Sequence, residues 1–313
     1  GLLAGYSPTT NISDVALIDL EVRNLGTETN STLALSIYEM GGQGGNYSLQ
    51  ALSTQTKALM FDCAVGCPLK HYQMYFDYYG DYDYADKWVR SAILQTSTAF
   101  AYKDGSKVKA DADFSSGGVD ESKLTSASNS LVFDPLLPWR WEDLNKAASQ
   151  GATFLTTWMW SIGMFEEAVN HCSATDTTDS LAFWDKGVAY YTGSLEGTDG
   201  NSKTGTYGEL TYAYAERRCV EFKTCGVVGG SVSGGSRVNF ELATLFYDGQ
   251  RFLKAKQCSP LRALTYTIVQ LMTVPLVQST LRSAYLIGTN KLGQAGYSTV
   301  PVGKAEAAAC AAA

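Results

Sequence analysis

The segment ATFLTTWMWSIGMFEEAVNHC, residues 152–172, decides the fold class. Its apolar residues recur every three or four positions, as in Leu155, Trp158, Ile162 and Phe165. This spacing is that of one buried stripe on an amphipathic helix, because an α-helix has 3.6 residues per turn. The segment therefore predicts a helix of about five turns that packs into a core.

The same helical spacing extends over most of the chain, whereas alternating strand patterns with hairpin turns are scarce. Further helices are predicted at 12–40, 48–63, 84–102, 180–196, 208–222, 238–256 and 261–287. Asn11 or Ser13 is the expected N-cap of the first of these helices, and Pro275 is expected to kink the last. The predicted fold is all-α, with two helical-bundle-like halves packed around a cleft and Gly/Ser-rich connecting loops.

The predicted division of the chain follows its composition. Residues 103–130 are polar and acidic and are interpreted as a connecting segment. They separate an N-terminal helical half, residues 1–102, from a C-terminal helical half, residues 131–304. Residues 305–313 form a low-complexity tail, which is interpreted as a frayed helix or a stub before a lost anchor.

Composition excludes several classes of function. The chain has 313 residues, of which 45% are hydrophobic, so it can bury a sizeable core. Lys and Arg number 24 against 31 Asp and Glu, and this net charge of −7 argues against nucleic-acid binding. The two histidines, His71 and His171, are too few for a site with three His ligands. The apolar stretch 261–288 is not a membrane span, because Arg262, Gln270, Pro275, Gln278 and Arg282 interrupt it.

Seven cysteines favour an oxidising compartment and hence a secreted, periplasmic or cell-surface protein. The expected pairs are Cys63 with Cys67 and Cys219 with Cys225, with Cys172–Cys258 as a long-range tie. Spacing alone does not fix this connectivity, and buried free thiols in a reducing compartment remain the alternative. Three N-x-S/T sequons, at Asn11, Asn30 and Asn46, are candidate glycosylation sites.

The segment HYQMYFDYYGDYDYAD, residues 71–86, holds six tyrosines and four aspartates. Phenolate and carboxylate are hard oxygen donors, which a small trivalent cation such as Fe(III) prefers. On one helix, Tyr75, Tyr78, Tyr82 and Asp86 would share a face, although Gly80 is expected to bend the chain. The candidate metal ligands here are Tyr78, Tyr79, Asp81, Tyr82 and Asp86. The alternative is an aromatic packing belt with solvated aspartates.

A second group of candidate ligands comprises Glu209, Tyr212 and Glu216, whose offsets of three and seven predict one helical stripe. Helix bundles build metal sites from carboxylates at such spacing. Because Arg217 and Arg218 follow directly, a structural ion-pair cluster is the competing interpretation.

Three further carboxylates complete the set of candidates. Glu166 lies at the edge of the apolar stripe and is a candidate buried ligand, whereas His171 is expected on the polar side of the same helix. Asp185 and Glu196 are eleven residues apart and aligned if a single helix contains both.

Five segments resemble the algal Fe-assimilating proteins, a family that includes high-CO2-inducible periplasmic proteins of green algae and the phytotransferrins of diatoms. These segments are YYGDYDYADKWV at 78–89, WDKGVAYYTGSLEG at 184–197, GELTYAYAERRCVEFKTCG at 208–226, VNFELATLFYDGQ at 238–250 and VPLVQSTLRSAY at 274–285. The resemblance implies a secreted or cell-surface protein for iron uptake that binds Fe(III) with carbonate as a synergistic anion.

The sequence therefore leads to the hypothesis of an Fe(III) carrier in which oxygen side chains from both halves form one pocket. Arg217 or Arg282 is expected to hold the anion, because guanidinium matches carbonate bidentately. A cell-surface or membrane-protein partner and an oligomeric state are left open. The first alternative is a glycosylated scaffold that binds no metal and uses its tyrosines for contacts. A second is an enzyme, a hydrolase or ferroxidase that uses a metal and Glu166 or Glu167 with His171.

Overall fold

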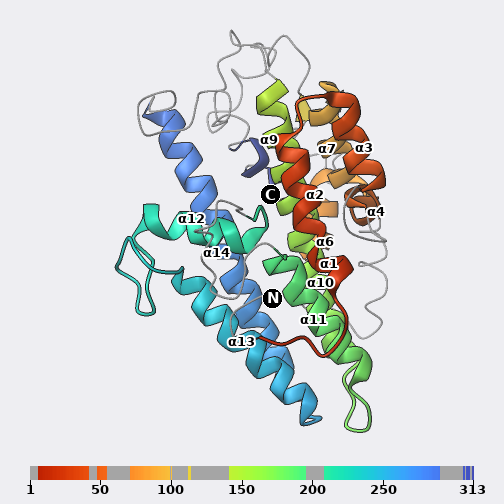
Figure 1. Cartoon of the computed structure of the whole chain (residues 1–313), viewed down its shortest axis with the longest axis vertical. Coiled ribbons are helices and arrows are strands. Elements are labelled where there is room, and N and C mark those ends of the chain that lie inside the picture. Colours follow the sequence, from red (N-terminus) through yellow and green to blue (C-terminus); the bar gives the residue numbers. More distant parts are fainter. Residues whose placement is uncertain are drawn as a thin grey trace.

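The computed structural model describes residues 6–41, 48–54, 71–98, 100, 112–113, 141–194, 208–289, 306, 308–310 and 312–313. The fold is all-α, as predicted (Figure 1). The strands within the described part of the chain are β1 (Ser97–Thr98) and β2 (Ala112–Asp113), which pair antiparallel. No described helix is both long enough and apolar enough to cross a membrane.

The central element is a continuous helical run formed by α9 (Trp141–Gly151), the π-helix η1 (Ala152–Thr157) and α10 (Trp158–Asn170). All six residues of η1 are buried, and so are most residues of α10, in agreement with the predicted apolar stripe. The run begins earlier than the sequence pattern predicted, and its middle turn is wound as a π-helix.

Some of the N-terminal helices pack directly on α9 or η1, and the others pack on neighbouring helices. The N-terminal helices are α1 (Ser13–Ala16), α2 (Ile18–Thr27), α3 (Ser31–Met40), α4 (Leu49–Thr54), α6 (His71–Tyr79) and α7 (Tyr84–Leu94). Both α2 and α7 contact α9, so helices from the two predicted halves share one hydrophobic core. The predicted boundary at 103–130 lies outside the described residues except for β2, and the division into halves stays a prediction.

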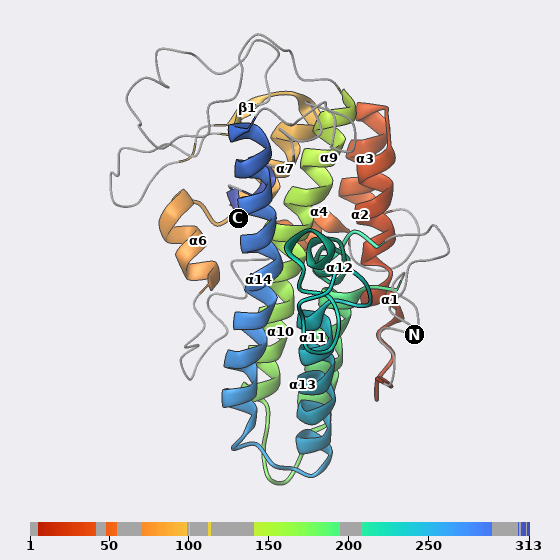
Figure 2. The same cartoon turned by 90° about the vertical axis from the view of Figure 1, so that its left-hand side faces the viewer.

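The C-terminal helices pack beside α10 and beside one another, and the last of them extends along most of the length of the molecule (Figure 2). They are α11 (Thr178–Thr192), α12 (Thr211–Phe222), α13 (Arg237–Lys254) and α14 (Leu261–Gly288). Gly249 of α13 allows the ring of Trp184 to approach closely, since a Cβ atom at this position would lie 1.9 Å from the ring. Trp184 donates its indole N–H to the carbonyl oxygen of Phe246 at 3.0 Å, which anchors α11 on α13.

Several predicted helices are shorter than their apolar patterns suggested. The single helix expected over 12–40 is divided into α1, α2 and α3, and the side chain of Asn30 caps α3 by accepting from the N–H groups of Thr32 and Leu33. Asn11 accepts from the N–H of Ser13 in a local turn, but the cap position of α1 is Ile12. At the start of α3, a polar side chain therefore competes for backbone N–H groups.

Two other predicted helices end early at residues with positive φ. The helix expected over 84–102 ends at Leu94, because Gln95 adopts a left-handed conformation with φ of 55°. The helix expected over 180–196 ends at Thr192, because Gly193 has φ of 73°. A Cβ atom at Gly193 would also lie 2.4 Å from the carboxylate of Asp19, so both backbone and space favour glycine here.

Candidate ligand-binding site

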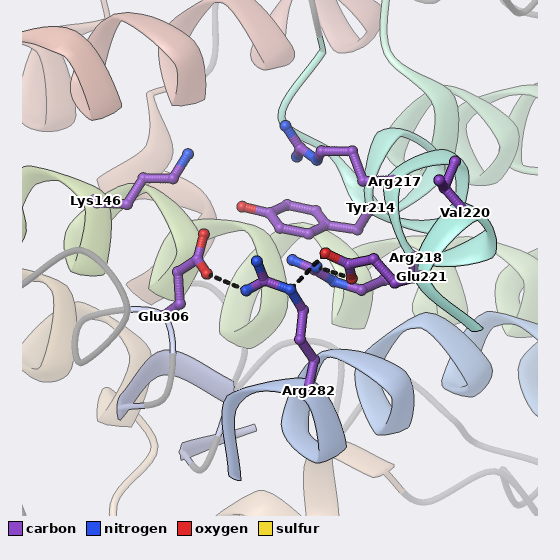
Figure 3. A pocket seen from close by; sticks show the side chains of 8 residues that line it. All are labelled: Lys146, Tyr214, Arg217, Arg218, Val220, Glu221, Arg282 and Glu306. Carbon is purple, nitrogen blue, oxygen red and sulfur yellow. Dashed lines mark hydrogen bonds and ion pairs between the residues drawn. The ribbon is translucent and has the colours of Figure 1, made fainter. Parts of the chain in front are cut away.

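A pocket of about 390 Å³ lies between α9, α12, α14 and the C-terminal segment, defined here as the described residues between Glu306 and Ala313. Its lining is mainly charged (Figure 3). The residues that line it are Lys146, Tyr214, Arg217, Arg218, Val220, Glu221, Arg282 and Glu306. It therefore collects cationic groups from three helices in a protein whose net charge is −7.

One side of the pocket is built around Glu209, which precedes α12. Its carboxylate accepts from Lys146 Nζ at 3.1 Å and from a terminal nitrogen of Arg217 at 3.2 Å. It also accepts from the hydroxyl of Tyr214 at 3.3 Å. The guanidinium carbon of Arg217 lies 4.3 Å from the centre of the Tyr214 ring, a cation–π contact.

These contacts shift the pKa values of both oxygen-bearing side chains. Burial acts to raise the pKa of Glu209, but the charges of Arg217 and Lys146 outweigh it and lower the pKa below its ordinary value. Burial and then the charge of Glu209 raise the pKa of Tyr214 well above its ordinary value. At neutral pH the pair is therefore an ionised carboxylate beside a neutral phenol.

The other side of the pocket is a chain of ion pairs. Glu221 bridges Arg218, at 2.5 Å, and Arg282, at 2.6 Å. Arg282 also contacts Glu306 of the C-terminal segment at 3.0 Å, and the second oxygen of Glu306 accepts from Gln150 at 3.3 Å. The pocket thus already contains carboxylate groups bound by guanidinium groups.

The π-helix positions the first side of this pocket. Thr153 donates its hydroxyl to the carbonyl oxygen of Glu209 at 2.7 Å, and Phe154 packs its ring against Tyr214 at a centroid distance of 4.8 Å. Consecutive residues of η1 thus fix both Glu209 and Tyr214. π-Helical turns occur frequently at functional sites.

Three of the predicted site residues meet here. Arg217 and Arg282, the predicted anion-binding residues, both line the pocket, and Glu209 joins it through Arg217 and Tyr214. Sequence reasoning missed Lys146, Tyr214, Arg218, Glu221 and Glu306. The alternation of tyrosines in TYAYAERR offered a signal for Tyr214, but it did not decide which tyrosine faces Glu209.

The predicted stripe of Glu209, Tyr212 and Glu216 does not form. Glu209 lies before the first residue of α12, so the helical offsets do not apply to it. Tyr212 is buried and packs its ring edge-on against Tyr191. Glu216 accepts from the N–H of Ser236 and from the side-chain amide of Asn239, and it therefore supports the loop before α13.

The tyrosine-rich segment 71–86 is divided by Gly80, whose φ is 69°, so the expected common face is interrupted between α6 and α7. The rings of Tyr75, Tyr79 and Tyr84 stack, with centroid distances of 5.1 Å from Tyr75 to Tyr84 and 5.0 Å from Tyr79 to Tyr84. The hydroxyl of Tyr75 donates to the backbone oxygen of Ala313, and that of Tyr79 donates to the backbone oxygen of Ala312. These phenols therefore hold the C-terminal segment.

The remaining predicted ligands of this segment have different partners. Tyr78 is 44% exposed and meets Tyr79 edge-on, and Tyr82 stacks on Phe76. Asp81 pairs with Lys87. Asp86 accepts from the hydroxyl of Tyr38 at 3.0 Å and from Arg90 Nε at 3.0 Å, which ties α3 to α7.

The other predicted carboxylates are also engaged. Glu166 is buried in α10, contacts Arg262 and has a raised pKa, chiefly because of its burial. Asp185 is fully buried and accepts from Tyr6, Thr9, Thr10 and Gln250, so it anchors the N-terminal segment. Glu196 lies outside the described residues.

The predicted disulfides are present where the structure describes them. Cys172 pairs with Cys258, and Cys219 pairs with Cys225 at the end of α12 beside the pocket. Cys63 and Cys67 lie outside the described residues.

The candidate glycosylation sites Asn11 and Asn30 are exposed, whereas Asn46 lies outside the described residues. His171 is paired with Glu167 at 3.3 Å at the end of α10, and it does not line the pocket.

Within the described ranges, no group of three or more His, Cys, Asp or Glu side chains is arranged to hold a metal ion. No family model, no curated protein and no solved structure matches this chain.

Proposed function

We propose that this protein binds Fe(III) together with a small oxyanion such as carbonate, for iron assimilation at the cell surface or in a secretory compartment. The observation that carries the proposal is the contact of 3.3 Å between the Tyr214 hydroxyl and the Glu209 carboxylate, beside a pocket lined by four cationic groups. Two oxygens at this separation can bind one hard cation. The sequence segments that resemble algal Fe-assimilating proteins include both residues.

The charge balance of the site favours an anion as one of its ligands. Three carboxylates, Glu209, Glu221 and Glu306, face four cationic side chains, so the cluster has one positive charge in excess. A carbonate held by Arg217 or Arg282 would offset this charge together with part of the charge of Fe(III), and it would supply further oxygen donors to the metal. Tyr214 would lose its proton on binding, because phenolate is the form that ligates the metal.

Other features of the chain support the proposed location. Cys172–Cys258 and Cys219–Cys225 are disulfides, which form and persist in oxidising compartments. Asn11 and Asn30 are exposed within N-x-S/T sequons, as glycosylation in a secretory pathway requires.

The test is a titration of metal-free protein with Fe(III) supplied as its acetohydroxamate complex, with and without bicarbonate, followed by buffer exchange. We expect bound iron by elemental analysis and a visible phenolate-to-Fe(III) charge-transfer band that requires bicarbonate. Tyr214→Phe should remove the band. Tyr78→Phe, a change of the half-exposed tyrosine on α6, is the matched control and should retain it.

A scaffold function is the second candidate, and one observation favours it. Tyr75 and Tyr79 use their hydroxyl groups to bind backbone oxygens of the C-terminal segment, so the tyrosine-rich segment serves packing. If the titration yields neither a band nor bound iron, the scaffold becomes the better explanation.

A further inference from the structure

We infer that the pocket recognises a polycarboxylate, a small organic anion with two or three carboxylate groups, one of which replaces Glu306 on Arg282. This inference rests on the proposed function for the location of the site only, since it concerns binding without iron. Three properties of the pocket support it: its size, the directions of its cationic groups and the contacts that it already makes with carboxylates.

The size of the pocket exceeds what a planar inorganic anion needs. Its volume is about 390 Å³. Carbonate has four heavy atoms and a tricarboxylate has about three times as many, and the pocket has room for the larger anion.

The cationic groups approach the pocket from different elements. Lys146 comes from α9, Arg217 and Arg218 come from α12, and Arg282 comes from α14 (Figure 3). A ligand with one anionic group meets only part of this lining. A ligand whose carboxylates diverge from a short carbon frame can meet cationic groups on more than one helix at the same time.

The guanidinium group of Arg217, like that of Arg282, already binds a carboxylate of the protein. Arg217 directs its terminal nitrogens to Glu209, but its Nε atom is buried and has no hydrogen-bond partner within the described part of the chain. This Nε atom has no surface open to the pocket, so a ligand carboxylate would bind Arg217 through its terminal nitrogens, in competition with Glu209. Guanidinium groups bind carboxylates bidentately, which gives the preference for this class of anion.

Glu306 indicates where a ligand carboxylate would bind. Its carboxylate forms an ion pair with Arg282 at 3.0 Å and accepts a hydrogen bond from the side-chain amide of Gln150 at 3.3 Å. Other hydrogen bonds hold the backbone of the C-terminal segment independently of Glu306. The hydroxyl of Thr280 donates to the backbone oxygen of Cys310, and that of Tyr79 donates to the backbone oxygen of Ala312. Glu306 can therefore leave Arg282 without release of the segment, and one carboxylate–guanidinium pair is exchanged for another.

The experiment is isothermal titration calorimetry of metal-free full-length protein at pH 7 and fixed ionic strength. The probes are tricarballylate and citrate, with acetate, bicarbonate and inorganic phosphate as comparison anions. We expect the two tricarboxylates to bind at least about 100-fold more tightly than any comparison anion, a difference of about 2.7 kcal/mol. Equal or tighter binding of phosphate, or no preference over acetate, would overturn the inference.

Variants locate the binding. Arg282→Gln should weaken the binding of tricarballylate about tenfold or more. Glu306→Gln should strengthen this binding several-fold, because the side chain that competes with the ligand for Arg282 loses its charge. Arg237→Gln is the matched control, since Arg237 pairs with Glu241 on α13 and does not line the pocket. If Glu306→Gln weakens binding, or Arg237→Gln matches Arg282→Gln, the inference fails.

Failure of this inference leaves the iron proposal testable. The iron titration with bicarbonate is done without a tricarboxylate, and the calorimetry is done without iron. A band without tricarboxylate binding would retain the proposed function and reject the polycarboxylate, and the opposite result would do the reverse.

Discussion

The tyrosine-rich segment 71–86 and the pocket both contain buried phenols, but these phenols have different neighbours. Tyr79 lies in a stack of aromatic rings and donates to a backbone oxygen. Tyr214 lies under a guanidinium group and donates to a carboxylate. The first environment suits packing, and the second suits binding of charged ligands. The number of tyrosines in a segment therefore says less about ligand binding than the charged groups that the fold places beside each tyrosine.

The largest expected effect tests the packing side of this comparison. Tyr79→Ala removes a fully buried ring that contacts Tyr75, Tyr84 and Phe100. We expect the free energy of unfolding to fall by about 3–5 kcal/mol, as for other large-to-small aromatic changes in cores. Urea denaturation followed by circular dichroism measures this change. A loss below about 1 kcal/mol would mean that the stack does not support the fold.

The next effect concerns charge in the pocket and depends on pH. Glu209→Gln leaves Lys146 and Arg217 without their shared carboxylate, so we expect a loss of about 1–3 kcal/mol in unfolding free energy at pH 7. The pKa of Glu209 is lowered in the folded protein from its ordinary value of 4.5. Its stabilising contribution is therefore complete above that value and declines as the pH falls through the folded pKa.

The measurement for this prediction is a series of urea denaturation curves between pH 7 and pH 3. Wild type and Glu209→Gln should differ most at pH 7 and converge in acid, because glutamine does not titrate. Glu241→Gln, which removes an exposed partner of Arg237, is the control and should stay within about 0.5 kcal/mol of wild type. A difference that grows in acid would contradict the assigned direction of the pKa shift.

The sequence predicted the all-α class but only part of the pocket, because the two depend on contacts over different distances along the chain. Helix formation follows from apolar spacing within one segment, which is why 152–172 sufficed for the fold class. The pocket depends on long-range contacts, such as the one between Lys146 on α9 and Glu209 before α12. Arg217 and Arg282 could be named as anion ligands from their charge, but Glu306, which pairs with Arg282, lies in a tail of low-complexity sequence.

Helix ends were predicted least well for a related reason. Gln95 and Gly193 terminate helices through positive φ values that the apolar pattern does not encode. The π-helical turn at 152–157 likewise depends on what packs around it, because the hydroxyl of Thr153 bonds a residue that is 56 positions away.

A smaller effect separates the hydroxyl of Tyr79 from its ring. Tyr79→Phe keeps the stack and removes only the hydrogen bond to Ala312. We expect a loss of about 1 kcal/mol in unfolding free energy, the usual net value of one hydrogen bond. Tricarballylate affinity should change less than twofold, since Glu306 keeps its own contacts. A large change in affinity in this variant would show that the two regions act together through the C-terminal segment.

The smallest expected effect on stability should accompany a clear effect on binding. Arg217→Lys keeps the positive charge near Glu209 but removes the planar group over Tyr214 and the buried Nε donor. We expect a loss of about 0.5–1 kcal/mol in unfolding free energy, which is the size of one cation–π contact. Binding of tricarballylate should weaken about tenfold, because an ammonium group does not bind a carboxylate bidentately. Calorimetry and urea denaturation of one protein preparation give both numbers. If the variant loses stability but keeps full affinity for tricarballylate, the prediction is wrong. Arg217 would then serve packing, as Tyr79 does, and not ligand binding.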